Sequence, residues 1–364
     1  MQKKTVKKIE QSGKKIIEKI FLIFESNKKK TIPNLDNINK VLVFRLDERI
    51  GNGILLLPLL NSLRCSLAHS RIDLLIHKPV AELFMAAKKD VLSNILPYDQ
   101  PLFFKRPWRL VKMVRNLRQA QYDVIITSHN YDNFSLSQAL FGRLCNGKCL
   151  VGFEWKNSNR FYDIAVKVTE EKHYAAAMMD LWKIFDPDSK FKLGGLMAFR
   201  NEVKNEQKGN DVKNEDVLLW LGAGQGGDKN IPPKVLDFIL NIIDERRISV
   251  KIATSVSDAD QLALYSPKIV SKTLIWDKNL VETAKFFSRY QMFISGDTGP
   301  MHLAAALGLS TLGIFLRTNL NRYGYRDEKS HFSLIWENDD ASYESLKCYL
   351  IKLLDKLQSS KLKK

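Results

Sequence analysis

The most specific chemical pattern in the sequence is the stretch Ser295–Gly308, which reads SGDTGPMHLAAALG. An apolar run ends here, two glycines free the backbone, and a helical pattern begins. The free N–H groups and the positive dipole at such a helix start suit a phosphate group. Thr298 can add a hydroxyl, and Asp297 can accept hydrogen bonds from sugar hydroxyls. Glycine on both sides and the nearby His302 favour this interpretation over a simple helix cap by Asp297 or Thr298.

A second glycine-rich stretch, GAGQGGDK, follows another apolar run. The small residues Gly222, Ala223 and Gly224 let backbone amides approach a ligand closely, and Lys229 can meet a phosphate as a point charge. The stretch lacks the Gly-Lys-Ser/Thr of a Walker motif and does not match the dinucleotide fingerprint. Taken alone, it is equally compatible with a flexible surface turn.

A third cluster of polar residues lies in RLDERIGNGILLLP, residues 45–58, between a predicted strand and a predicted helix. A general base is expected here if the first half of the chain binds the acceptor of a transfer reaction. The alternative is a set of ion pairs among Asp47, Glu48, Arg45 and Arg49.

The sequence predicts no metal site and no Ser/His/Asp arrangement. The six histidines are scattered, and Cys145 and Cys149 have no second pair at zinc-ligand spacing. Four cysteines in 364 residues make no disulfide framework, which favours a reducing cytoplasm. No apolar run is long enough to span a membrane, and the acidic residues near the N-terminus argue against a signal peptide.

Strands must alternate with helices to position these three motifs. One alternation starts at Val41–Leu46 and a second at Val217–Leu221, which predicts two doubly wound parallel sheets with a cleft between them. Every glycine-rich turn follows a predicted strand, and ligands bind such sheets at the carboxyl ends of the strands. Predicted helices include Ile54–Leu67, Asp258–Leu264 and His302–Leu307. The predicted segments are a basic amphipathic extension (1–37), a first doubly wound domain (38–199), a polar linker (200–216), a second doubly wound domain (217–335) and a C-terminal helix with a basic tail (336–364).

Charge is distributed unevenly along the chain. The 57 Lys and Arg exceed the 40 Asp and Glu by 17, and residues 1–30 alone hold ten Lys against three Glu. Isoleucines recur there at helical spacing, so this segment either lies in a membrane interface or packs on its own domain. Anionic surfaces attract such basic ends.

A further basic stretch runs from Lys105 to Arg118 without an acidic residue and includes Trp108. Leu110, Val111, Val114 and Leu117 give it an apolar stripe, which predicts a surface helix. Its cationic face is either merely solvated or turned toward an anion. The residues predicted to form an acceptor or anion-binding surface are Arg45, Arg49, Lys105, Arg106, Arg109 and Lys112.

These residues resemble a known family. DTGPMHLAA, residues 297–305, strongly resembles the nucleotide-sugar motif of the family 9 glycosyltransferases, the lipopolysaccharide heptosyltransferases. The segment from Val41 to Leu60 looks like the first strand, turn and helix of that family. The stretch from Gly222 to Lys229 resembles its central phosphate loop. The resemblance spans about residues 41–320.

The resemblance implies the α/β GT-B fold: two Rossmann-like doubly wound domains facing each other across a cleft, no metal or other cofactor, and a C-terminal helix that returns to the first domain. It also implies transfer of a heptose from ADP-heptose, with inversion, to the lipopolysaccharide inner core. The domain at 38–199 would then bind the acceptor, and the domain at 217–335 would bind the nucleotide sugar. Asp297 would then bind the donor sugar, and Lys229 would neutralise the diphosphate. Thr298, Gly299 and His302 would line the phosphates, and Lys278 would lie near the nucleoside.

One departure concerns the base. Many family members have Gly-Asp at the first turn, with that Asp as the proposed base, whereas this chain has Gly51-Asn52. An amide cannot take a proton near neutral pH, so either Asp47 replaces it, or this branch works differently, or the activity is lost. The two catalytic candidates are therefore Asp47 and Asn52.

The resulting hypothesis is a cytoplasmic, monomeric enzyme, peripheral on the inner face of the cytoplasmic membrane. Its partners would be a nucleotide sugar and an anionic lipopolysaccharide acceptor. Two rivals are the same fold with another sugar nucleotide and a catalytically inactive sugar-nucleotide-binding scaffold. A nucleic-acid binder is disfavoured, because no aromatics cluster at base-stacking spacing.

Overall fold

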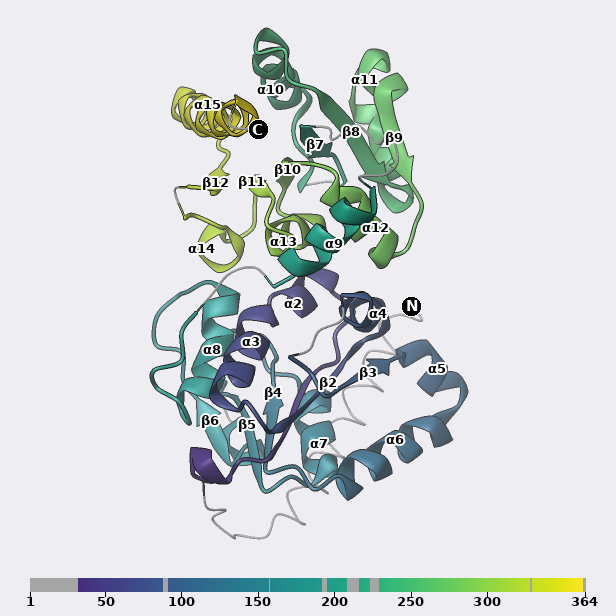
Figure 1. Cartoon of the computed structure of the whole chain (residues 1–364), viewed down its shortest axis with the longest axis vertical. Coiled ribbons are helices and arrows are strands. Elements are labelled where there is room, and N and C mark those ends of the chain that lie inside the picture. The colour runs from purple at the N-terminus through teal and green to yellow at the C-terminus, as the bar shows by residue number, and fades with distance from the viewer. Residues whose placement is uncertain are drawn as a thin grey trace, which may run out of the picture.

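The computed structural model describes residues 32–87, 91–156, 158–191, 195–207, 216–222, 229–327 and 329–362. Nearly all of the predicted N-terminal extension lies outside these residues, as do Ala223 and Gly224 of the second motif. The described chain forms two six-stranded parallel sheets, each flanked by helices, and these lie one above the other (Figure 1). This arrangement confirms the predicted GT-B architecture.

The first sheet has the strand order β3-β2-β1-β4-β5-β6. Its central strand β1 (Lys40–Arg45) is buried from Val41 onward, because helices cover both faces of a parallel sheet. The other strands are β2 (Arg71–His77), β3 (Asn94–Tyr98), β4 (Val124–Thr127), β5 (Cys149–Phe153) and β6 (Ile164–Val166). The helices are α2 (Ile50–Ile54), α3 (Leu57–Ser66), α4 (Lys78–Ala86), α5 (Gln100–Lys105), α6 (Pro107–Gln119), α7 (Leu136–Cys145) and α8 (Tyr174–Lys183).

The second sheet has the order β12-β11-β10-β7-β8-β9. Its strands are β7 (Val217–Trp220), β8 (Val250–Ser255), β9 (Thr273–Trp276), β10 (Met292–Gly296), β11 (Ser310–Phe315) and β12 (His331–Ile335). Its helices are α10 (Pro233–Glu245), α11 (Pro267–Lys272), α12 (Leu280–Ser288), α13 (Gly299–Ala306), α14 (Leu320–Tyr323) and α15 (Asp340–Leu362). In both sheets the first strand of the domain is central, so the turns that follow β1 and β7 lie in the middle of the sheet edge.

Three predicted helices differ in detail. The single helix expected over 54–67 is two helices, α2 and α3, because Pro58 has no N–H to donate and occupies the first turn of α3. Residues 256–264 form a 3₁₀ helix rather than an α-helix. Helix α13 begins at Gly299, three residues before the predicted start at His302.

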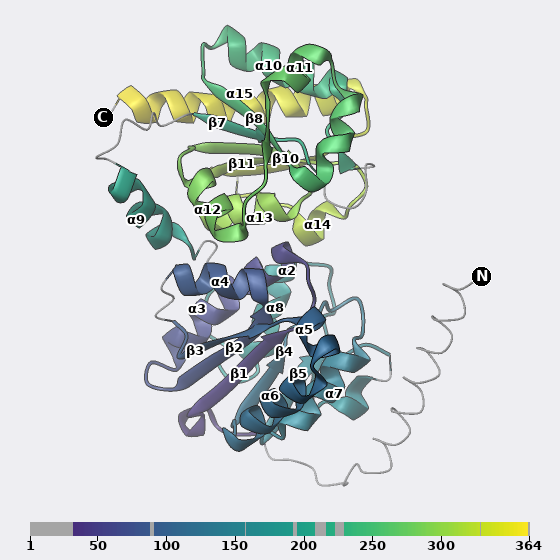
Figure 2. The same ribbon diagram turned by 90° about the vertical axis from the view of Figure 1, so that its right-hand side faces the viewer.

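The predicted linker is helical over its first part. Helix α9 (Met197–Gln207) leaves the first domain and packs against α12 of the second (Figure 2). The guanidinium of Arg200 is buried and donates to the carbonyl oxygens of Gly308 and Tyr290, at 2.9 and 2.5 Å. The polar residues that predicted a linker from residue 200 therefore lie, up to Gln207, on a helix that packs against the second domain.

The C-terminal helix α15 stays on the second domain. It packs against α10, β11 and β12, and its five leucines at 346, 350, 353, 354 and 357 are buried in that core. Lys361 also pairs with Asp216 at 2.5 Å. The expected return of this helix to the first domain was therefore wrong. None of the helices that the structure describes has the length and apolar character to cross a membrane.

Candidate active site

The first and third motifs meet at the interface of the two domains. Helix α2 packs against α13, and a Cβ atom placed on Gly51 would lie 2.7 Å from Cδ2 of His302. The same Cβ would lie 3.4 Å from Cα of Gly299. Only glycine permits this approach, so the loop that carries Asp47 and Asn52 lies against the start of α13.

The N-terminus of α13 has an unused hydroxyl group. Thr298 is the N-cap residue, with φ −140° and ψ 158°, but its side chain makes no capping hydrogen bond. Its Oγ1 atom is buried and has no hydrogen-bond partner among the described residues. The helix-cap interpretation of this side chain was therefore wrong. A buried hydroxyl without a partner, at the positive end of a helix dipole, is what a phosphate would need.

Lys229 and Asp297 form an ion pair, with Nζ and Oδ2 3.2 Å apart. The Asp297 side chain is 7% exposed and that of Lys229 is 37% exposed. A Cβ atom on Gly296 would lie 2.6 Å from the Lys229 carbonyl oxygen, so glycine lets the Lys229 segment cross the end of β10. The structure thus brings the second motif to the first and holds the ammonium group beside the start of α13.

His302 is buried, and its Nδ1 atom lies 2.8 Å from the Tyr325 hydroxyl oxygen. Burial lowers the pKa of His302 to about 4; Lys229 lowers it further, whereas Asp297 opposes the shift. His173 packs on the Tyr325 ring, and burial followed by the nearby His302 also lowers its pKa to about 4. Both imidazoles are neutral at pH 7, so His302 can offer a phosphate a hydrogen bond but no positive charge.

Asp47 is held in place by three donors. Its Oδ2 accepts from Nε of Arg45 at 2.5 Å, and its Oδ1 accepts from Nδ2 of Asn52 at 3.1 Å and from the backbone N–H of Arg49 at 3.2 Å. Asn52 is buried, whereas the Asp47 side chain is 26% exposed. The amide therefore orients a carboxylate that solvent can still reach, and the ion pair weighed as an alternative exists between Asp47 and Arg45.

The predicted acceptor surface does not form as a unit. Arg45 is buried, and its two Nη atoms donate to the carbonyl oxygen of Ser128 and to Oδ1 of Asn130. It is a positioning residue rather than a surface cation. Arg49 is exposed beside the site. The remaining members, Lys105, Arg106, Arg109 and Lys112, lie at the end of α5 and along α6, on the outside of the first domain (Figure 2).

A cavity of about 350 Å³ lies between the domains beside the start of α13. Gly299, Pro300 and Ile50 line it together with Lys278, so the structure brings Lys278 to the same site. Its apolar wall includes Trp220 and Trp276, and Trp276 stacks on Phe286 with ring centroids 4.3 Å apart. Sequence analysis missed both tryptophans, although each is the last residue of a strand.

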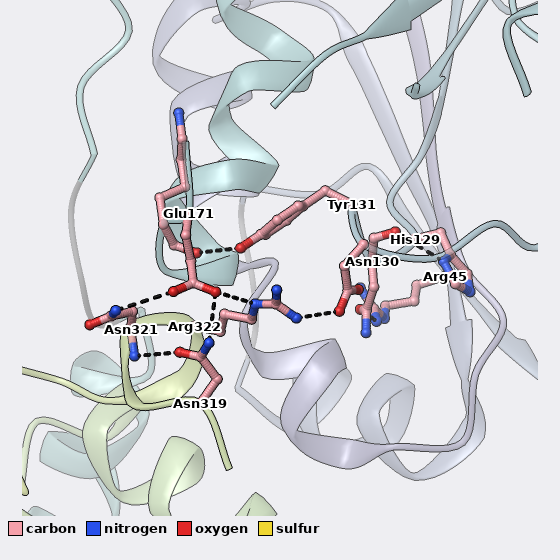
Figure 3. A network of polar contacts seen from close by, with 10 residues as sticks. Arg45, His129, Asn130, Tyr131, Glu171, Asn319, Asn321 and Arg322 are labelled. Atoms are coloured by element: carbon pink, nitrogen blue, oxygen red, sulfur yellow. Dashed lines mark hydrogen bonds and ion pairs between the residues drawn. The ribbon is translucent and has the colours of Figure 1, made fainter. Parts of the chain in front are cut away.

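Sequence analysis also missed a polar network that joins the domains (Figure 3). Arg322 of α14 donates to Oδ2 of Asp132 at 2.6 Å and to Oε1 of Glu171 at 2.9 Å, both on the first domain. Asn319 and Asn321 donate to the same Glu171 carboxylate. These residues are far apart in the chain and follow no motif, so no sequence signal indicated their contact.

His129 was missed as well. It follows β4 close to Arg45, and burial, together with that arginine, lowers the pKa of its imidazole. Within the described ranges no three His, Cys, Asp or Glu side chains gather as a metal site would require.

Two facing Rossmann-like domains, with a phosphate-suited helix start opposite an acidic loop, define a glycosyltransferase of the GT-B class. The model of glycosyltransferase family 9 (heptosyltransferase) matches residues 110–349, more than half of the chain. The chain therefore belongs to that family. A search of curated protein sequences finds no match.

Solved structures of the family share the fold. A family 9 glycosyltransferase from Veillonella parvula is 15% identical, with a TM-score of 0.68 over 89% of this chain and 99% of its own. E. coli heptosyltransferase WaaC with ADP is 15% identical, with a TM-score of 0.66 over 86% and 99%. E. coli ADP-heptose lipopolysaccharide heptosyltransferase II is 15% identical, with a TM-score of 0.59 over 88% and 99%.

The unpartnered Thr298 hydroxyl leads to a first prediction. Thr298→Val removes a buried polar atom without breaking a described hydrogen bond, so thermal stability should be unchanged or higher. A lost hydrogen bond to a charged group costs about 1.5–3 kcal/mol, so ADP affinity should fall by roughly tenfold or more. Calorimetric titration with ADP measures the affinity, and thermal melts measure the stability.

Thr311→Val is the matched control: it breaks the 2.8 Å contact with His331, away from the site, and should lose stability but not affinity. Unchanged ADP affinity in Thr298→Val would show that the Thr298 hydroxyl does not bind the phosphate.

The buried imidazoles lead to a second prediction. The pKa values of His173 and His302 lie near 4 in the folded state, below the ordinary 6.5, so the unfolded chain binds more protons between these values. Stability should therefore fall as pH falls from about 6.5 to about 4, by up to ~1.4 kcal/mol per pH unit for each group. His173→Asn keeps a capping side chain at the start of α8 and should flatten this dependence. His69→Asn, at an exposed position, should not. Parallel denaturation series for the three proteins test this, and equal slopes would show that His173 does not titrate in this way.

Proposed function

We propose that this chain is an inverting, metal-independent transferase that moves a heptose from ADP-heptose to an acceptor in the lipopolysaccharide inner core. The observation that carries the proposal is the unpartnered Thr298 hydroxyl at the N-terminus of α13, beside Lys229 and facing the Asp47 loop. Family membership and the similarity to E. coli WaaC, solved with ADP and with ADP-2-deoxy-2-fluoro heptose, support a nucleotide-sugar donor.

The donor would lie across the carboxyl edge of the second sheet. Its nucleoside would occupy the cavity beside Trp276 and Lys278, and its diphosphate would meet Thr298 and Gly299. The diphosphate competes with Asp297 for the Lys229 ammonium. When Lys229 moves to the phosphate, the Asp297 carboxylate becomes free to accept hydrogen bonds from the heptose hydroxyls. Preorganised N–H groups, the helix dipole and Lys229 would stabilise the departing diphosphate.

The acceptor hydroxyl must lose its proton as the new C–O bond forms. Asp132 and Glu171 of the first domain are engaged by Arg322, whereas Asp47 lies in the loop before α2, which packs against α13. Asn52 and Arg45 hold Asp47 in one orientation. In this proposal the Asp47 carboxylate takes the proton, and Asn52 is a positioning residue rather than a base.

The enzyme would work as a cytoplasmic monomer, peripheral on the inner face of the cytoplasmic membrane, with no cofactor and no nucleic-acid partner. The supporting observations are the surplus of 17 basic charges and the lipid-bound nature of a lipopolysaccharide acceptor. The basic segment 1–30, which lies outside the described residues, would contribute to membrane attachment.

Incubation with ADP-heptose and a panel of truncated acceptors, followed by mass spectrometry, tests the function. A one-heptose mass increment on one acceptor is expected. Binding of ADP-heptose without any increment would favour the inactive scaffold, which the Gly51-Asn52 departure motivates. An increment only with a different sugar nucleotide would preserve the transferase and replace the donor.

A third prediction concerns the base. Asp47→Asn should lower turnover by ~10²–10⁴-fold, the usual span for general base catalysis, while ADP affinity hardly changes because the other domain binds the donor. Stability should also fall, since the buried Arg45 loses its charged partner. Turnover is therefore measured per folded molecule, with melting temperature recorded alongside. Glu48→Gln, at the exposed neighbouring position, is the control and should keep normal turnover. Near-normal turnover of folded Asp47→Asn would eliminate Asp47 as the base.

A further inference from the structure

We propose that the outward face of α6 is a membrane-docking surface for a bilayer containing anionic phospholipid, with Trp108 and Val111 entering its headgroup region. The proposal refines the membrane association suggested above, but its evidence comes from α6 alone and does not depend on the donor or the acceptor.

Helix α6 has two contrasting faces. Leu117 is buried, and Leu110, Met113 and Val114 are partly buried against the first domain's core. Trp108 is 63% exposed and Val111 is 67% exposed, one helical turn apart on the opposite side. The expectation that Val111 belongs to the inward stripe was therefore wrong. An outward tryptophan and valine serve no purpose in the packing of this domain.

Cations surround this apolar pair. Lys112 and Arg115 follow Trp108 by four and seven residues, so they share its face. None of the six basic side chains from Lys105 to Arg118 forms an ion pair with a described residue. By contrast, three cations elsewhere on the same domain pair with carboxylates: Arg143 with Asp163, Lys148 with Asp123, and Lys172 with Asp180. Helix α6 thus carries several positive charges that no described carboxylate neutralises, whereas these three cations elsewhere on the domain are neutralised by carboxylates.

A basic hollow of about 570 Å³ lies beside the C-terminal end of α6. Arg115 and Arg118 line it from the helix, and Lys148 lines it from the turn after α7. Its charge suits the phosphate of a lipid headgroup, which would bind farther along the same helix than the inserted Trp108–Val111 pair.

The combination favours a bilayer over other anionic partners. Tryptophan prefers the membrane–water interface, and an outward aliphatic side chain gains free energy only when it leaves water. A nucleic-acid backbone would use the cations but not Val111. Helix α6 lies on the outside of the first domain in both views, and no described element of the second domain covers it (Figures 1 and 2). Because α6 precedes β4, its Trp108 end points toward the carboxyl edge of the sheet, where a lipid-linked acceptor must enter.

Co-sedimentation of the full chain with phosphatidylcholine vesicles, with and without phosphatidylglycerol, tests the proposal. The parent protein should bind preferentially to the anionic vesicles. Arg115→Glu/Arg118→Glu should weaken that binding at least roughly tenfold at low salt, since each cation near an anionic surface adds about 1 kcal/mol. Trp108→Ser/Val111→Ser should weaken the part of the binding that survives high salt. Brominated lipids should quench the tryptophan emission of the parent and lose that effect in Trp108→Phe.

Matched controls lie on the second domain. Lys268→Glu/Lys272→Glu makes the same charge change on the exposed side of α11, and Val256→Ser/Leu264→Ser removes two similarly exposed apolar side chains. Both should bind vesicles like the parent.

Parental binding by the α6 variants, or quenching that persists in Trp108→Phe, would overturn the proposal and leave attachment to another part of the chain. Binding of duplex DNA is measured for the same variants. If the α6 variants lose DNA binding but keep vesicle binding, the membrane proposal is overturned in favour of a nucleic-acid-binding surface. Transfer to a soluble, delipidated acceptor is measured separately, so failure of the proposed function would not be confused with failure of docking.

Discussion

The site depends on one close contact, that of Gly51 with the first turn of α13. A side chain at position 51 would meet the His302 ring at 2.7 Å, so only a bare backbone lets α2 lie against the helix start. This contact sets the distance between the domain that carries Asp47 and the domain that carries Thr298. Helix α9, clamped by Arg200, and the Arg322–Glu171–Asp132 network join the same two domains at other points.

Besides the Arg322 network, two further ion pairs lie at the interface, and they differ in which partner is buried. Arg45 is buried and has used its donors on Asp47, Ser128 and Asn130, so it fixes a carboxylate that stays partly exposed. Lys229 is the more exposed partner of the buried Asp297, and in the proposed donor complex it would leave that carboxylate for the diphosphate. His302 and His173 are neutral. Among the side chains of Lys229, Asp297, His302 and His173, the positive charge is therefore that of Lys229.

The two proposals assign chemistry and membrane attachment to different parts of the molecule. Reactive groups lie at the carboxyl edges of the two sheets, where strand ends leave backbone groups unpaired. The cations of α6 form no ion pair with a described residue and lie on the outside of the first domain, so in the docking proposal an anionic surface binds there without occupying the site. Helix α15 contributes to neither, because its leucines complete the core of the second domain.

The sequence by itself determined the alternation of strands and helices, and with it the two sheets, because apolar runs and glycine turns act locally. It also determined that residues 296–302 form a strand end and a helix start, since that motif is contiguous. It did not reveal that Thr298 leaves its hydroxyl free, that Lys229 pairs with Asp297, or that Arg45 is buried. Nor did it place α15 and α9, or turn Val111 outward. Each of these outcomes depends on side chains from distant segments competing for the same donors or the same core, and only the tertiary structure decides that competition.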